Sequence, residues 1–97
     1  MATTRKQDLH HMAATLEAWA GQIADLRAKA RSAGTERQLV MGRQLTALRQ
    51  QQRAYAAQMA GTQGASAAVF RDMQRGAARI AGEFRRLYLQ TASRFPC

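Results

Sequence analysis

Arginine is the residue type with the clearest capacity for chemistry in this sequence. The 97 residues include 15 Lys and Arg against 6 Asp and Glu, so the net charge is +9. An α-helix would place four arginines within roughly 80° of one another, namely Arg71, Arg75, Arg79 and Arg86. One guanidinium group can donate two hydrogen bonds to the oxygens of one phosphate. This spacing therefore predicts a ridge of arginines that contacts a polyanion. A solvated face without a ligand is the alternative interpretation.

Histidine, cysteine and hydroxyl side chains offer little further chemistry. His10 and His11 are adjacent, and neighbouring helical positions point about 100° apart, which makes a poor chelating pair. No Cys or carboxylate cluster completes a zinc site beside them. Cys97 lies at the end of the sequence, and no Gly-rich phosphate loop or Ser-His-Asp arrangement is present. We therefore expect no metal, no cofactor and no enzymatic activity.

The sequence as a whole is typical of a bacterial cytoplasmic protein. Its single cysteine excludes an internal disulfide, in keeping with a reducing compartment. No run of 18 apolar residues could form a transmembrane helix, and residues 1–8 are polar, unlike a secretory signal. The basic surface favours a nucleic acid or an acidic protein as partner. A membrane partner is not expected, because the bulky apolar residues belong to heptad stripes.

Apolar residues in the first third of the chain follow steps of three and four. The stripe consists of Leu9, Met12, Leu16, Trp19, Ile23 and Leu26, and it continues through Ala30 and Ala33. An average step of 3.5 residues is the pattern of a left-handed coiled coil. The position of Trp19 in this stripe favours core packing over ligand stacking.

The stripe changes register in the middle of the chain. A second stripe consists of Met41, Leu45, Leu48, Gln52, Tyr55 and Met59. Three successive steps of four join the two stripes, which is a stutter that locally unwinds a supercoil. No proline interrupts residues 5–60, so the sequence predicts one long helix over about residues 5–60, bent near residues 34–42.

Glycine and hydroxyl residues over 61–66 predict the turn that ends this helix. Gly61 is suited to a left-handed helix cap, and Thr62 or Ser66 to capping the next helix. A shorter helix over about residues 65–93 should follow. Its apolar stripe consists of Val69, Met73, Ala77, Ile80, Phe84, Leu87 and Thr91. The expected fold is all-α: a single domain over residues 1–97 that forms an antiparallel coiled-coil hairpin, with the turn at 61–65.

Helix lengths predict self-association. At 1.5 Å per residue the long helix would measure roughly 84 Å and the short one roughly 44 Å. The first half of the long helix would then have no partner within the chain and would expose an apolar stripe. We expect a homodimer or a four-helix assembly through Leu9, Met12, Leu16, Trp19, Ile23 and Leu26.

The chain also resembles a family of small bacterial coiled-coil domain-containing proteins of the stress-response type. The resemblance is carried by Leu16-Glu17-x-Trp19-x-x-x-Ile23-x-x-Leu26 and by Phe70-x-x-Met73-x-x-Gly76-Ala77-x-x-Ile80-Ala81-x-x-Phe84. It implies a self-associating helical hairpin without enzyme activity. The chain departs from that family in having Arg and Gln where the family is rich in acidic residues.

The favoured function is therefore that of a non-enzymatic, self-associating structural or adaptor protein with an Arg-rich surface. One alternative is a nucleoid-type protein that binds nucleic acid without sequence preference. The other is an amphipathic protein of anionic membranes.

Overall fold

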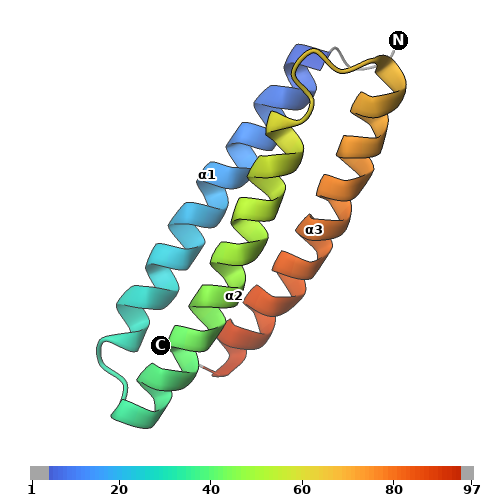
Figure 1. Ribbon diagram of the computed structural model, residues 1–97. Coiled ribbons are helices and arrows are strands. Elements are labelled where there is room, and N and C mark those ends of the chain that lie inside the picture. Colours follow the sequence, from blue (N-terminus) through green and yellow to red (C-terminus); the bar gives the residue numbers. More distant parts are fainter. Residues whose placement is uncertain (1–4, 95–97) are drawn as a thin grey trace.

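Three α-helices of similar length form the described part of the chain. The computed structural model describes residues 5–94, which fold into α1 (Arg5–Ala30), α2 (Thr35–Ala60) and α3 (Ala67–Arg94). Successive helices run in opposite directions and make an elongated up-down-up bundle (Figure 1) of 50 × 18 × 17 Å. The all-α class is confirmed, whereas the hairpin of one long and one short helix is wrong.

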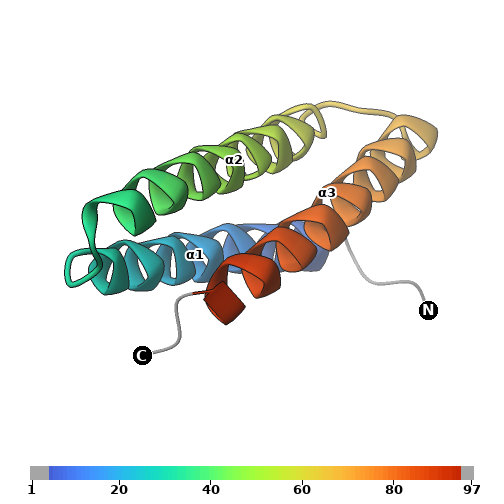
Figure 2. The same ribbon diagram turned by 90° about the horizontal axis from the view of Figure 1, so that it is seen from below.

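The continuous helix predicted over residues 5–60 is interrupted at residues 31–34. Gly34 has extended backbone angles, φ −66° and ψ 166°, and its carbonyl accepts the first hydrogen bond of α2 from the Gln38 amide at 2.9 Å. Figure 2 shows the short connection that turns the chain back on itself. The reversal lets α2 cover the apolar stripe of α1, and burial of that stripe outweighs the helical hydrogen bonds lost at the turn.

The second turn falls where the sequence predicts it, over residues 61–66. Gly61 has φ −66°, so it is not the left-handed cap that the sequence suggested; Gly64 has the positive φ, at 69°. The Ser66 hydroxyl oxygen accepts a hydrogen bond from the Val69 amide at 3.3 Å and caps α3 as predicted. Thr62 instead donates to the Met59 carbonyl oxygen at 2.6 Å.

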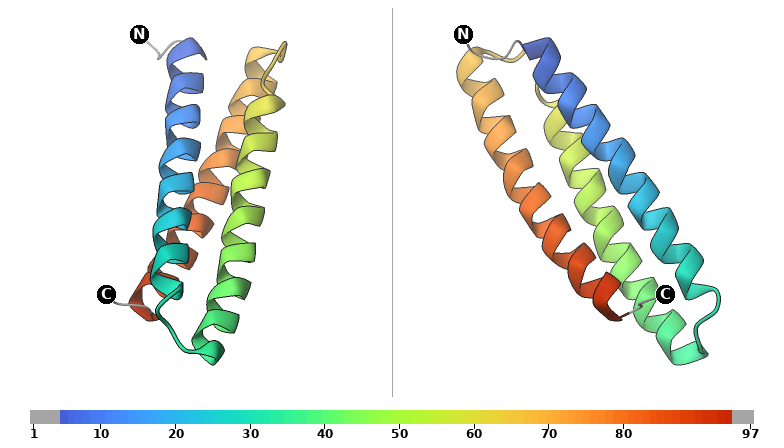
Figure 3. Two further views of the ribbon diagram at one scale, coloured as in Figure 1. Left: turned by 90° about the vertical axis from the view of Figure 1, so that its left-hand side faces the viewer. Right: turned by 180° about the vertical axis from the view of Figure 1, so that it is seen from behind.

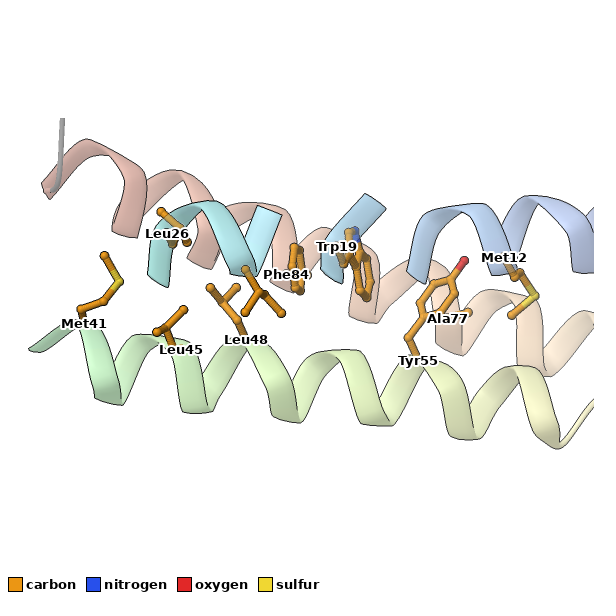
Figure 4. Close-up of a cluster of buried hydrophobic side chains, with 10 residues drawn as sticks. Met12, Trp19, Leu26, Met41, Leu45, Leu48, Tyr55, Ala77 and Phe84 are labelled. Atoms are coloured by element: carbon orange, nitrogen blue, oxygen red, sulfur yellow. The ribbon is translucent and has the colours of Figure 1, made fainter. Parts of the chain in front are cut away.

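The core is a column of side chains contributed by all three helices, which point toward one another in Figure 4. Its buried members are Met12, Trp19, Ile23, Leu26, Met41, Leu45, Leu48, Tyr55, Ala77 and Phe84. These residues recur at heptad spacing on each helix, so one narrow stripe per helix is sufficient to fill the bundle.

The three helices are not packed equally. α2 packs closely along both α1 and α3, whereas the backbones of α1 and α3 approach each other less closely. Figure 3 shows the three helices from two further sides. The start of α1 is tied to the second turn by Arg5, whose Nη1 donates to the Ala65 carbonyl at 2.8 Å. The same guanidinium lies 4.5 Å from the centre of the Phe70 ring, a cation–π contact.

Candidate functional site

The four predicted arginines lie on one face of α3. Arg71, Arg75, Arg79 and Arg86 are all exposed. The buried residues of the same helix occupy the opposite side, namely Phe70, Ala77, Phe84 and Thr91. The structure therefore presents these arginines to solvent along roughly 22 Å of helix. We call this surface the arginine face.

Few carboxylates neutralise this surface. α3 carries six arginines against two acidic residues, Asp72 and Glu83. Among the described residues, the one ion pair within 4.0 Å joins Arg75 Nη2 to Asp72 Oδ1 at 3.6 Å, with both side chains more than 70% exposed. The attraction within an exposed ion pair of this kind is weak, so the pair is easily broken. The arginine face thus keeps most of its positive charge available to a ligand.

Two further exposed arginines lie at one end of the bundle. The Thr91 hydroxyl lies 3.3 Å from Gln44 Oε1, which places this turn of α2 beside the last turn of α3. Arg43 and Arg94 are exposed at this end of the bundle. Arg94 lies one residue beyond the helix predicted over residues 65–93, so the sequence did not assign it to the arginine face.

The six residues predicted to join two chains are instead packed within one chain. Met12, Trp19, Ile23 and Leu26 are buried, while Leu9 and Leu16 are partly buried against the same core. The premise that the N-terminal helix lacks an intrachain partner is therefore wrong, because α2 and α3 cover it. Self-association stays a prediction. The apolar stripe on which it was based is not exposed, because it is packed within the chain.

Trp19 packs against side chains of both other helices in the same chain. Its ring stacks on Phe84 of α3, with centroids 4.0 Å apart and planes 5° apart. It also meets Tyr55 of α2 edge-to-face, with centroids 4.8 Å apart. Core packing, rather than ligand stacking, is the role that these contacts support.

A shallow groove runs between α1 and α3. It consists of two adjoining hollows of about 300 and 360 Å³, which share Thr15 and Ala81 in their walls. Leu89, 54% exposed, lies at its edge. No local sequence pattern encodes this groove, because it results from the distance between two helices that are not consecutive.

The histidines have no partners for a metal site. His10 and His11 are exposed on α1, and residues 5–94 contain no group of three His, Cys, Asp or Glu side chains that could hold a metal ion. Cys97 lies outside the described residues. In this same part of the chain, no helix is both long enough and apolar enough to cross a membrane.

Comparison with known proteins identified no relative of this chain. No family model, no curated protein and no solved structure matches this chain. The resemblance to the bacterial coiled-coil family therefore stays a prediction.

Proposed function

We propose that this chain is a non-enzymatic protein that binds the phosphate backbone of nucleic acid through the arginine face, without reading base sequence. One observation carries the proposal: Arg71, Arg75, Arg79 and Arg86 share one exposed face of α3. The self-associating adaptor favoured by the sequence has less support, because the apolar stripe on which it rested is packed inside the chain.

Duplex backbone suits this face better than a single strand. The four arginines follow one straight helix, so they offer a linear row of cations to a regular line of phosphates. Sequence-tolerant binding of single strands relies on exposed aromatic rings that stack on bases. Of the aromatic residues in the described part of the chain, Trp19, Tyr55, Phe70 and Phe84 are buried and Tyr88 is partly buried.

The proposal is tested by fluorescence anisotropy with a labelled 20-base-pair duplex at two salt concentrations. Replacing the four arginines of the face by glutamine should weaken binding at least about tenfold, and should reduce the slope of log K against log salt by roughly 3 to 4 units. The matched control replaces four exposed arginines elsewhere, namely Arg27, Arg31, Arg37 and Arg53.

The two variants carry the same net charge, so they separate a local face from a general charge effect. A large loss in the face variant together with a small loss in the control supports the arginine face. Equal losses would mean that net charge alone attracts the duplex. If the native protein does not bind the duplex at low salt, the proposal is refuted.

A second candidate is a protein adaptor that accepts an acidic amphipathic helix in the groove between α1 and α3. The presence of this groove supports the second candidate, because a helix can dock in a groove between two helices. The net charge of +9 favours an acidic partner. A synthetic acidic helical peptide can serve as probe. Binding at this site should shift the NMR signals of Thr15 and Ala81, whereas shifts confined to the arginine face would exclude the groove. The membrane alternative has the least support, because most bulky apolar residues of the three helices pack in the core, although Val69 is exposed.

A further inference from the structure

The turn between α1 and α2 is short and keeps two helix-like hydrogen bonds. It spans only residues 31–34, and no residue in it has a positive φ. The Arg31 amide donates to the Ala28 carbonyl at 3.3 Å and the Ala33 amide to the Ala30 carbonyl at 3.1 Å, which are helix-like bonds of the tighter type. Gly34, with ψ 166°, departs clearly from the helical region. A conformational change confined to residues 31–34 would therefore join α1 and α2 into a continuous helix.

The apolar stripes on either side of the turn are in phase for a straight helix. Met12 and Met41 are both buried core residues and lie 29 residues apart in the sequence. At 3.6 residues per turn this separation is about eight complete turns, so a straight helix would place both on the same face. The sequence is thus compatible with two states, a closed turn and a continuous helix, in which the same apolar residues pack against neighbouring helices.

We propose that two copies of this chain exchange α1 by straightening the turn at residues 31–34. In the exchanged dimer, α1 and α2 of each copy form one continuous helix, and α1 of each copy packs on α2 and α3 of the other. Trp19 of one copy then stacks on Phe84 and meets Tyr55 of its partner. The interface consists of Leu9, Met12, Leu16, Trp19, Ile23 and Leu26, the residues that the heptad pattern assigned to self-association.

Energetics favour exchange over simple opening. α1 contributes Met12, Trp19, Ile23 and Leu26 to the core, so an open monomer would expose these residues and the surfaces that receive them. A second copy restores each of these contacts, and the two forms then differ mainly at the turn and in the entropy of association. A Cβ atom on Gly34 would meet nothing within 4 Å in the closed turn, so a side chain at this position can be used to test the exchange. This inference does not depend on nucleic-acid binding.

The experiment compares two substitutions at the turn. Gly34→Ala fits the closed form, which has φ −66° and open space, but it favours a helix at this position. Two such residues per dimer should raise the dimerisation constant roughly 30-fold. Gly34→Pro also fits φ −66°, but proline inside a helix removes a hydrogen bond and clashes with the preceding turn, so the dimer should disappear.

Gly21→Ala is the matched control. Gly21 lies within α1, and a Cβ atom there would also meet nothing within 4 Å. This substitution should stabilise both forms alike and leave the dimerisation constant within about twofold. Each protein is unfolded by heat at high concentration, cooled, and separated by size-exclusion chromatography with light scattering. Circular dichroism checks that each variant is folded.

Shape distinguishes exchange from side-by-side association. The exchanged dimer contains a straight helix over residues 5–60 of roughly 84 Å, whereas the monomer extends 50 Å. Small-angle scattering of the dimer peak should show this longer dimension. A dimer that is equally abundant in Gly34→Ala and Gly34→Pro, or that Gly21→Ala favours as strongly as Gly34→Ala, would overturn the proposal. So would a Gly34→Ala protein that stays monomeric at millimolar concentration.

Discussion

At the scale of single residues, Trp19 contributes more to the structure than any pattern in the sequence indicates. Its heptad position predicts burial, and burial is observed at 7% exposure. The sequence could not identify its partners, because Phe84 and Tyr55 become neighbours only when three helices pack together. One ring thereby links α1 to both other helices.

Replacing Trp19 by alanine should lower the free energy of unfolding by about 3–5 kcal/mol, because it leaves a cavity and removes two ring contacts. Trp19→Phe should cost less, since a smaller ring still stacks on Phe84. Glu17→Ala serves as the control, because Glu17 is exposed on the same helix, and its effect should stay within about 0.5 kcal/mol. Urea unfolding followed by circular dichroism measures all three. Equal midpoints for Trp19→Ala and Glu17→Ala would contradict the assignment of Trp19 to the core.

At the scale of elements, the turn between α2 and α3 depends on the backbone conformation of Gly64. Its φ of 69° is in the left-handed region, and a Cβ atom there would meet nothing within 4 Å. Gly64→Ala should therefore cost about 1–2 kcal/mol through backbone strain alone. Gly64→Asn should cost less, because asparagine tolerates this region better. Thermal unfolding of the two variants tests this order, and an alanine variant as stable as the native protein would refute it.

The two turns also show why one helix boundary could be predicted and the other could not. Breaking residues cluster over 61–66, so the predicted helix over 65–93 closely matches Ala67–Arg94. The first turn has one isolated glycine, Gly34, and although the heptad repeat is broken there, the stripes on both sides would share one face of a straight helix. No local signal distinguishes a bend from a reversal there. The reversal is decided by burial of α1 against α2 and α3, which is a tertiary effect.

The candidate site also separates into features that local sequence patterns predict and features that depend on tertiary packing. The arginine face was predictable from spacing, because it belongs to one continuous helix, α3. Packing of the six stripe residues against other helices was also predictable, but the fact that those helices belong to the same chain was not. The groove between α1 and α3 could not be predicted, since helices that are not consecutive in the sequence form it. Local periodicity thus predicts which face a residue occupies, but not which helix covers it.

At the scale of the whole molecule, the net charge of +9 is concentrated in a small volume. The bundle is only 18 × 17 Å in cross-section, which is about twice the Debye length of roughly 8–10 Å at 0.10–0.15 M salt. In the described part of the chain, a single exposed ion pair, Arg75 with Asp72, offsets the repulsion at close range. At about 0.10–0.15 M salt, repulsion across the bundle is largely screened, but at about 10 mM salt the Debye length of roughly 30 Å exceeds the bundle width, so like charges repel one another across the entire bundle and oppose the compact state.

This repulsion predicts that salt stabilises the protein. Raising NaCl from about 10 mM to about 300 mM should increase Tm by roughly 5 °C, because screening weakens repulsion between arginines more than it weakens the few attractive pairs. The glutamine variant of the arginine face has four fewer charges, so its Tm should rise less over the same range. Differential scanning calorimetry provides the measurement. A native Tm that falls with salt would mean that attractive ion pairs dominate, and the arginines would then be engaged within the chain rather than available to a polyanion.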